Sequence, residues 1–76
     1  MSQNIQSTIQ LNNFLQGRRQ AHLISWVEVP HGPQNHRTWS VTCKYNGSPV
    51  GEACASHKAE AKERAAAQAL TVLRGY

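Results

Sequence analysis

The chain has 76 residues, of which 39% are hydrophobic, and eight Lys and Arg against four Asp and Glu give it a net charge of +4 and a pI near 9.6. A chain of this length forms one domain, and it is too short for the Rossmann, TIM-barrel and two-domain folds in which many enzymes frame a cleft. The positive charge favours an anionic partner.

The N-terminal segment and the cysteine content predict an intracellular protein. Residues 1–7 are mostly polar, so we expect a flexible lead-in before a domain over residues 8–74. This segment lacks the basic and apolar stretches of a signal peptide, and no apolar run reaches the roughly 18 residues of a membrane span. Two cysteines are too few for the disulfide framework of a small secreted domain. We therefore expect a cytoplasmic or nuclear protein with no membrane partner.

The first half of the chain predicts a helix, a strand and a loop. Apolar residues at helical spacing, followed by Gly17, predict an amphipathic helix over residues 9–20. Residues 22–29 are rich in β-branched and aromatic side chains and predict a first strand. Residues 30–36 contain two prolines and a glycine, so they predict a loop.

The second half begins with a predicted β-hairpin. Residues 38–45 alternate apolar and polar side chains, which is typical of a strand with one buried and one wet face. Asn46-Gly47-Ser48 predicts a tight turn into a third strand over residues 49–55.

The two tryptophans are expected in different surroundings. Trp39 lies on the apolar face of the second strand, which predicts a core position. In an extended strand, the side chain of Trp26 points to the face opposite to Val27 and Val29. We therefore expect it at a sheet edge or at an interface with a partner.

The length of the hairpin loop decides whether the two cysteines can meet. With three loop residues, Cys43 faces Gly51 and Cys54 faces Ser40. With two loop residues, Cys54 faces Trp39 instead. Neither register brings the thiols together, so we expect no disulfide.

The last segment predicts a helix over residues 57–73, because it lacks Gly and Pro. Ser56 or His57 is expected to cap its start, and Gly75 to end it. Its inner face carries small and aliphatic residues at three- and four-residue spacing: Ala61, Ala65, Ala69, Val72 and Leu73. The predicted fold class is α+β, in the order α-β-β-β-α, with a three-stranded antiparallel sheet and two helices packed on one face.

Four segments carry a resemblance that covers nearly the whole chain, at residues 11–14, 32–33, 39–47 and 56–70. The last segment is similar to the signature Ser-Lys-Lys-x-Ala-Lys-x-x-Ala-Ala, and it follows a hairpin. On these segments the chain resembles the double-stranded RNA-binding domain. The resemblance implies a non-catalytic module that binds A-form duplex RNA by shape, with little sequence specificity, over about 16 base pairs.

The resemblance also implies three RNA-binding patches. One helix turn and one loop would each reach a minor groove, and the start of the last helix would reach the phosphates of the major groove between them. Lys58 and Lys62 lie four residues apart at a predicted helix N-terminus, which favours phosphate on physical grounds as well. The matching residues, in chain order, are Ile9, Asn13, Pro33, Asn35, His36, His57, Lys58 and Lys62.

Three positions depart from the family pattern. Asn13 stands where the family usually has Glu, and Ala59 stands in place of the middle lysine. The loop pattern Gly-Pro-x-His has Asn35 at its last position, with His36 one residue later. These departures leave open a protein-interaction or dimerising version of the fold with weak or no RNA binding.

Other functions are expected to be absent from this chain. The chain can be an accessory domain of a larger RNA-processing enzyme, but its residues contain no recognisable catalytic set. Four histidines and two cysteines lack the spacing of a zinc site. We therefore expect no metal, no cofactor and no small-molecule substrate. Without the resemblance, Lys58 and Lys62 would be interpreted as ordinary solvated residues.

Overall fold

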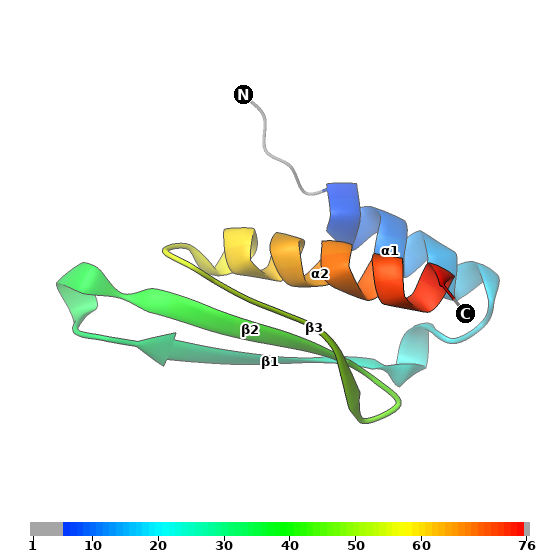
Figure 1. The fold of residues 1–76 in the computed structure, drawn as a ribbon, viewed down its shortest axis with the longest axis horizontal. Coiled ribbons are helices and arrows are strands. Elements are labelled where there is room, and N and C mark those ends of the chain that lie inside the picture. The colour runs from blue at the N-terminus through cyan, green and yellow to red at the C-terminus, as the bar shows by residue number, and fades with distance from the viewer. Residues whose placement is uncertain (1–5, 76) are drawn as a thin grey trace.

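The computed structural model describes residues 6–75 as a helix, three strands and a second helix (Figure 1). The three strands form one antiparallel sheet in the order β1-β2-β3. The predicted α-β-β-β-α fold is therefore confirmed. In chain order the elements are α1 (Gln6–Gly17), the 3-10 turn η1 (Ala21–Leu23), β1 (Ile24–His31), the 3-10 turn η2 (Gln34–His36), β2 (Thr38–Tyr45), β3 (Ser48–Ala55) and α2 (Lys58–Arg74).

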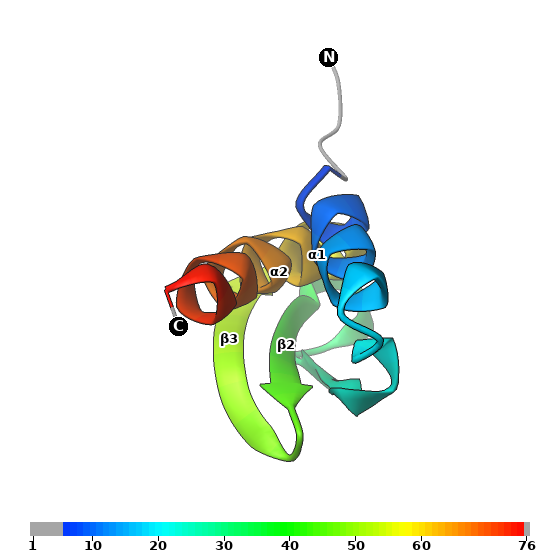
Figure 2. The ribbon, with the colours of Figure 1, turned by 90° about the vertical axis from the view of Figure 1, so that its right-hand side faces the viewer.

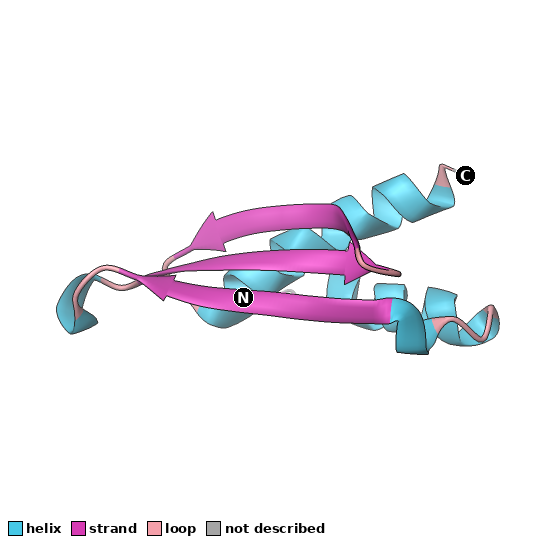
Figure 3. Cartoon of the chain, turned by 90° about the horizontal axis from the view of Figure 1, so that it is seen from below, coloured by secondary structure: helices cyan, strands magenta, loops and turns pink. Residues whose placement is uncertain are grey.

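Both helices lie on one face of the sheet, as the end-on view in Figure 2 shows. Seen from below in Figure 3, the strands lie in front of the helices and their other face is open. Helix α2 packs directly on β2 and β3, whereas α1 packs chiefly against α2. The buried hydrophobic side chains are Leu11, Leu15, Val41, Cys43, Ala61, Ala65, Ala66, Ala69, Leu70 and Leu73.

Helix α1 begins at Gln6, three residues before the predicted start, and ends at Gly17 rather than near Gln20. Ser7, which the sequence analysis assigned to a flexible lead-in, therefore lies in a helix. The earlier start has a tertiary cause, since a carboxylate from α2 accepts hydrogen bonds from the first turn. The rest of the predicted lead-in, residues 1–5, lies outside the described residues.

Strand β1 lies at an edge of the sheet, which agrees with one of the two positions expected for Trp26. Trp26 pairs with Cys43 and packs against the core on the helix side of the sheet. Val27 and Val29, by contrast, are each 41% exposed. Directly paired residues of an antiparallel sheet share one face, so the buried face of β2 decides which side chains of β1 turn inward. The strand also begins two residues later than predicted, because residues 21–23 form η1.

The β2–β3 hairpin combines the two registers considered for it. Asn46 and Gly47 both have positive φ, at 53° and 85°, and form a two-residue turn. A shift in register between Cys43 and Lys44 then restores the pairing expected for a three-residue loop. The resulting pairs include Trp39 with Ala55, Ser40 with Cys54, Val41 with Ala53 and Cys43 with Gly51.

The two cysteines lie on opposite faces of the hairpin, and both are free thiols. Cys43 is buried, whereas Cys54 is exposed with its Sγ 3.3 Å from the Oγ of Ser40. The expectation that the thiols do not pair is confirmed.

Helix α2 crosses β3 at Gly51, where the approach is very close. Gly51 is buried, and a Cβ added to it would lie 2.2 Å from the carbonyl oxygen of Ala65. Small residues are therefore needed on both the strand and the helix. The helix starts after His57, whose side chain makes no capping hydrogen bond, and it ends at Gly75 as predicted.

Candidate nucleic-acid interface

The first predicted patch lies on the outer side of α1. Ile9 is 49% exposed and Asn13 is exposed one turn later on the same face. Leu11 and Leu15 are fully or almost fully buried on the opposite side. The packing of the two leucines therefore directs Ile9 and Asn13 to solvent.

The second patch is the loop between β1 and β2. Pro33 precedes η2, and the His36 N–H donates to the Pro33 carbonyl oxygen at 3.0 Å. Gly32 has φ +86°, and a Cβ on it would lie 2.7 Å from the carbonyl oxygen of His36. The glycine thus permits a tight loop. Asn35 and His36 are both exposed within the same 3-10 turn, so the displaced histidine stays in the loop patch.

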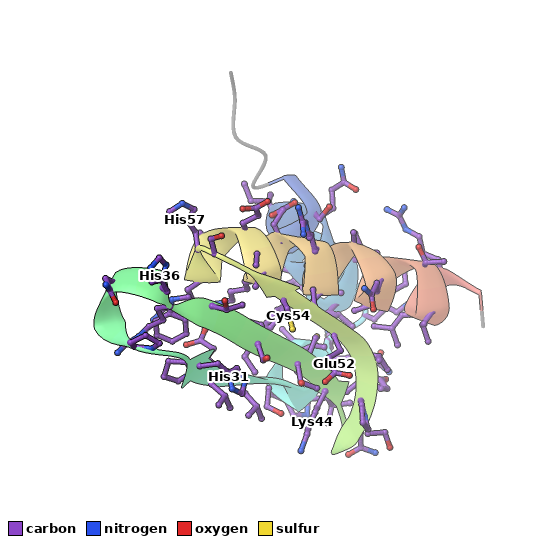
Figure 4. The ribbon with its side chains drawn as sticks, turned by 60° about the vertical axis from the view of Figure 1, so that its left-hand side comes forward. His31, His36, Lys44, Glu52, Cys54 and His57 are labelled. Carbon is purple, nitrogen blue, oxygen red and sulfur yellow. The ribbon has the colours of Figure 1, made fainter. Side chains whose placement is uncertain are left out.

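A surface hollow joins this loop to the start of α2. Its lining comes from the two segments alone, and Figure 4 shows His36 and His57 at the same end of the molecule. Arg37, which is not one of the predicted site residues, adds a cation to it. The hollow is lined by Asn35, His36, Arg37, Thr38, Ser56 and His57.

The third patch contains the two lysines of α2, and each ammonium group lies over a tryptophan ring. The Lys58 Nζ is 4.9 Å from the ring centroid of Trp39, and the Lys62 Nζ is 5.0 Å from that of Trp26. Both distances are within the range of a cation–π contact. The tryptophans, to which sequence reasoning gave no role beside the lysines, therefore hold the lysine heads over the helix side of β1 and β2.

Lys58 also has an acidic neighbour that sequence reasoning missed. Its Nζ lies 3.6 Å from Oε1 of Glu28, and the two side chains are 50% and 31% exposed. Glu28 pairs with Val41, so it lies on the helix side of the sheet with Trp26. The pairing of β1 with β2 is what turns this carboxylate toward α2. Among the described residues, Lys62 forms no ion pair with an acid.

Glu63 joins the two helices. Its carboxylate accepts hydrogen bonds from the Ser7 N–H, from the Thr8 N–H at 3.3 Å and from the Thr8 hydroxyl at 2.9 Å. Desolvation alone would raise the pKa of this carboxyl group, but the hydrogen bonds from Ser7 and Thr8 together hold its pKa below the ordinary value. No sequence signal points to this contact, because Thr8 and Ser7 lie 55 and 56 residues before Glu63 in the chain.

The buried thiol of Cys43 is not activated as a nucleophile. Burial raises the pKa of the Cys43 thiol to about 11, although nearby Lys62 opposes the shift, so this thiol is protonated at neutral pH. Within residues 6–75, no group of three His, Cys, Asp or Glu side chains is placed to hold a metal ion. None of the helices described is both long and apolar enough to cross a membrane.

The comparisons with known proteins agree with the fold and with the resemblance. The family model for the double-stranded RNA binding motif matches residues 9–73, a range that includes all eight predicted site residues. A comparison with curated proteins finds no match. The matched family is a binding domain rather than a catalytic one, and its partner is double-stranded RNA. The chain belongs to the family of double-stranded RNA binding motifs.

Proposed function

We propose that this chain recognises A-form RNA by shape through three patches on one surface. The loop and the start of α2 bind as a unit, and the exposed turn of α1 binds a second minor groove. The observation that carries the proposal is the hollow that joins Asn35 and His36 to His57, directly before Lys58. Two segments that are 21 residues apart in sequence thus present donors and cations side by side.

The contacts of the lysines support a phosphate-binding role. The tryptophan rings restrict both ammonium groups, so less side-chain entropy is lost when a phosphate binds. Lys58 exchanges its exposed ion pair with Glu28 for a phosphate, and exposed pairs of this kind are weak. Lys62 forms no ion pair among the described residues, so it has none to break when it binds a phosphate. The exposed imidazole of His57 adds a further hydrogen-bonding group directly before Lys58.

The polar residues of the other two patches support recognition of the ribose. The Asn13 and Asn35 amides can donate to and accept from a 2′-hydroxyl, and both side chains are exposed. This contact distinguishes RNA from DNA. Neither residue needs to read a base edge, which agrees with little sequence specificity.

The proposal is tested by titrating RNA and DNA duplexes of about 16 base pairs with the wild type and with Lys58→Ala/Lys62→Ala. We expect the wild type to prefer RNA, and the double variant to bind RNA roughly 30-fold more weakly, because two charge-assisted contacts are lost. The slope of log K against log salt should become shallower by about two.

The matched control removes the same charge from the opposite end of the molecule, in Lys44→Ala/Arg74→Ala. These residues lie near the β2–β3 turn and the end of α2, so their loss should change RNA affinity much less. Equal binding of RNA and DNA, or equal effects of the two double variants, would reject the proposal. A wild type with no RNA affinity would favour the protein-interaction version of the fold.

A further inference from the structure

We propose that Glu63 is a positioning residue for RNA binding, which aligns the α1 patch with the lysines of α2. The inference rests on the proposed function. The carboxylate of Glu63 accepts hydrogen bonds from the backbone and a hydroxyl of α1, so the role proposed for it requires no contact with RNA.

The first turn of α1 depends on a partner from outside the helix. A helix N-terminus carries free N–H groups, which acidic or capping side chains usually satisfy. Helix α1 has no acidic residue in its first turn. Glu63 accepts from two successive N–H groups there, and its negative charge also complements the positive end of the helix dipole.

The hydrophobic core does not hold this turn by itself. Ser7 and Thr8 are only partly buried and Ile9 is 49% exposed, so the fully buried side chains of α1 begin at Leu11. The leucines attach the middle of the helix to α2. The contact with Glu63 is therefore what orients the segment that carries Ile9.

The position of Glu63 makes it a direct link between two patches. It follows Lys62 in α2, and its partner Thr8 precedes Ile9 in α1. A negative charge beside a phosphate-binding lysine would by itself weaken RNA binding. Removing it therefore has two opposite effects: less repulsion of RNA, and loss of alignment between the helices.

The experiment compares Glu63→Gln with Glu60→Gln on RNA duplexes of about 16 and about 8 base pairs. Only the longer duplex can engage both minor grooves at once. We expect Glu63→Gln to bind the long duplex roughly five-fold more weakly, the size expected from a lost helix cap, with little loss on the short one. Glu60, which pairs with Arg64 at 2.7 Å, is the matched control, and its variant should lose no affinity for either length.

Thr8→Ala provides an independent test that leaves the charge of Glu63 in place. It removes only the hydroxyl contact, and alanine favours a helix, so the fold is expected to persist. We expect a smaller loss of affinity than for Glu63→Gln, again on the long duplex and with little loss on the short one.

The inference is overturned if Glu63→Gln binds the long duplex as tightly as Glu60→Gln does, or if both lengths lose affinity equally in folded protein. In either case the proposed function stands, since the wild type still binds duplex RNA. Failure of the wild type to prefer RNA over DNA would instead reject the proposed function itself.

Discussion

The two helices are attached to the molecule in different ways. Helix α2 lies on the sheet through a contact so close that Gly51 has no room for a side chain. Helix α1 packs chiefly on α2, through two leucines and through the carboxylate of Glu63. The sheet therefore determines the position of α2 and its lysines, whereas α1 and its patch depend on contacts between the helices.

The largest expected effect tests the attachment of α2. Gly51→Ala should lower the free energy of unfolding by about 3 kcal/mol or more, because the new methyl group would overlap the backbone of Ala65. Urea unfolding monitored by circular dichroism measures the change. Gly17→Ala is the control, since no atom lies within 4 Å of an added Cβ there, and it should change stability little. Equal stability of the two variants would show that α2 can move away from the sheet at low cost.

The next effect tests the hydrophobic attachment of α1. Leu11→Ala should cost about 2–3 kcal/mol of stability, because the leucine is fully buried between the helices. Ile9→Ala, two residues earlier on the exposed side, should change stability by less than about 1 kcal/mol. The same denaturation curves show whether the two faces of α1 differ in this way. Only Ile9→Ala should then weaken RNA binding in fully folded protein.

A smaller effect tests the polar attachment of α1 through its pH dependence. The pKa of Glu63 is lower in the folded chain than in the unfolded chain, so its contribution to stability is present above the unfolded pKa and lost as the pH falls through the folded pKa. We expect wild type to be more stable than Glu63→Gln by about 1 kcal/mol at pH 7, the size of a helix cap, with the difference shrinking in acid. A difference that is independent of pH down to strongly acidic conditions would contradict the carboxylate contact.

The smallest effect concerns the ion pair beside α2. Glu28→Gln should raise affinity for duplex RNA about two-fold. In this variant Lys58 has no ion pair with residue 28 to break before it binds a phosphate. Glu52→Gln removes a charge from an exposed position on β3 and serves as the control. Fluorescence anisotropy at low salt resolves the difference. Equal gains in both variants would mean that net charge alone is responsible.

Features that depend on neighbouring residues in the sequence were predicted accurately, whereas features that depend on contacts between distant residues were not. Strand β2 was predicted over its observed residues, because alternation along one strand is a local signal. Helix α2 was predicted to within one residue at each end, since alanine spacing and a terminal glycine are local as well. The predicted start of α1 was wrong, and the buried face of β1 was not predicted, because Glu63 and the register with β2 decide these two features.

The candidate site shows the same division. The sequence alone indicated the family, and the resemblance implied the site positions Ile9, Asn13, Asn35 and His36, which are all exposed in the structure. It did not indicate that Lys58 and Lys62 rest on tryptophan rings, nor that Glu28 faces Lys58. Those contacts join α2 to two different strands.

The sequence by itself determined the order of the elements, the alanine-rich inner face of the last helix and the two lysines at the start of that helix. Local propensity, spacing and composition are sufficient for these features. Only the tertiary structure decided which face of β1 is buried, how each lysine is held and how α1 is aligned with α2. These outcomes depend on contacts between residues far apart in the chain, and their energies become available only after the chain has folded.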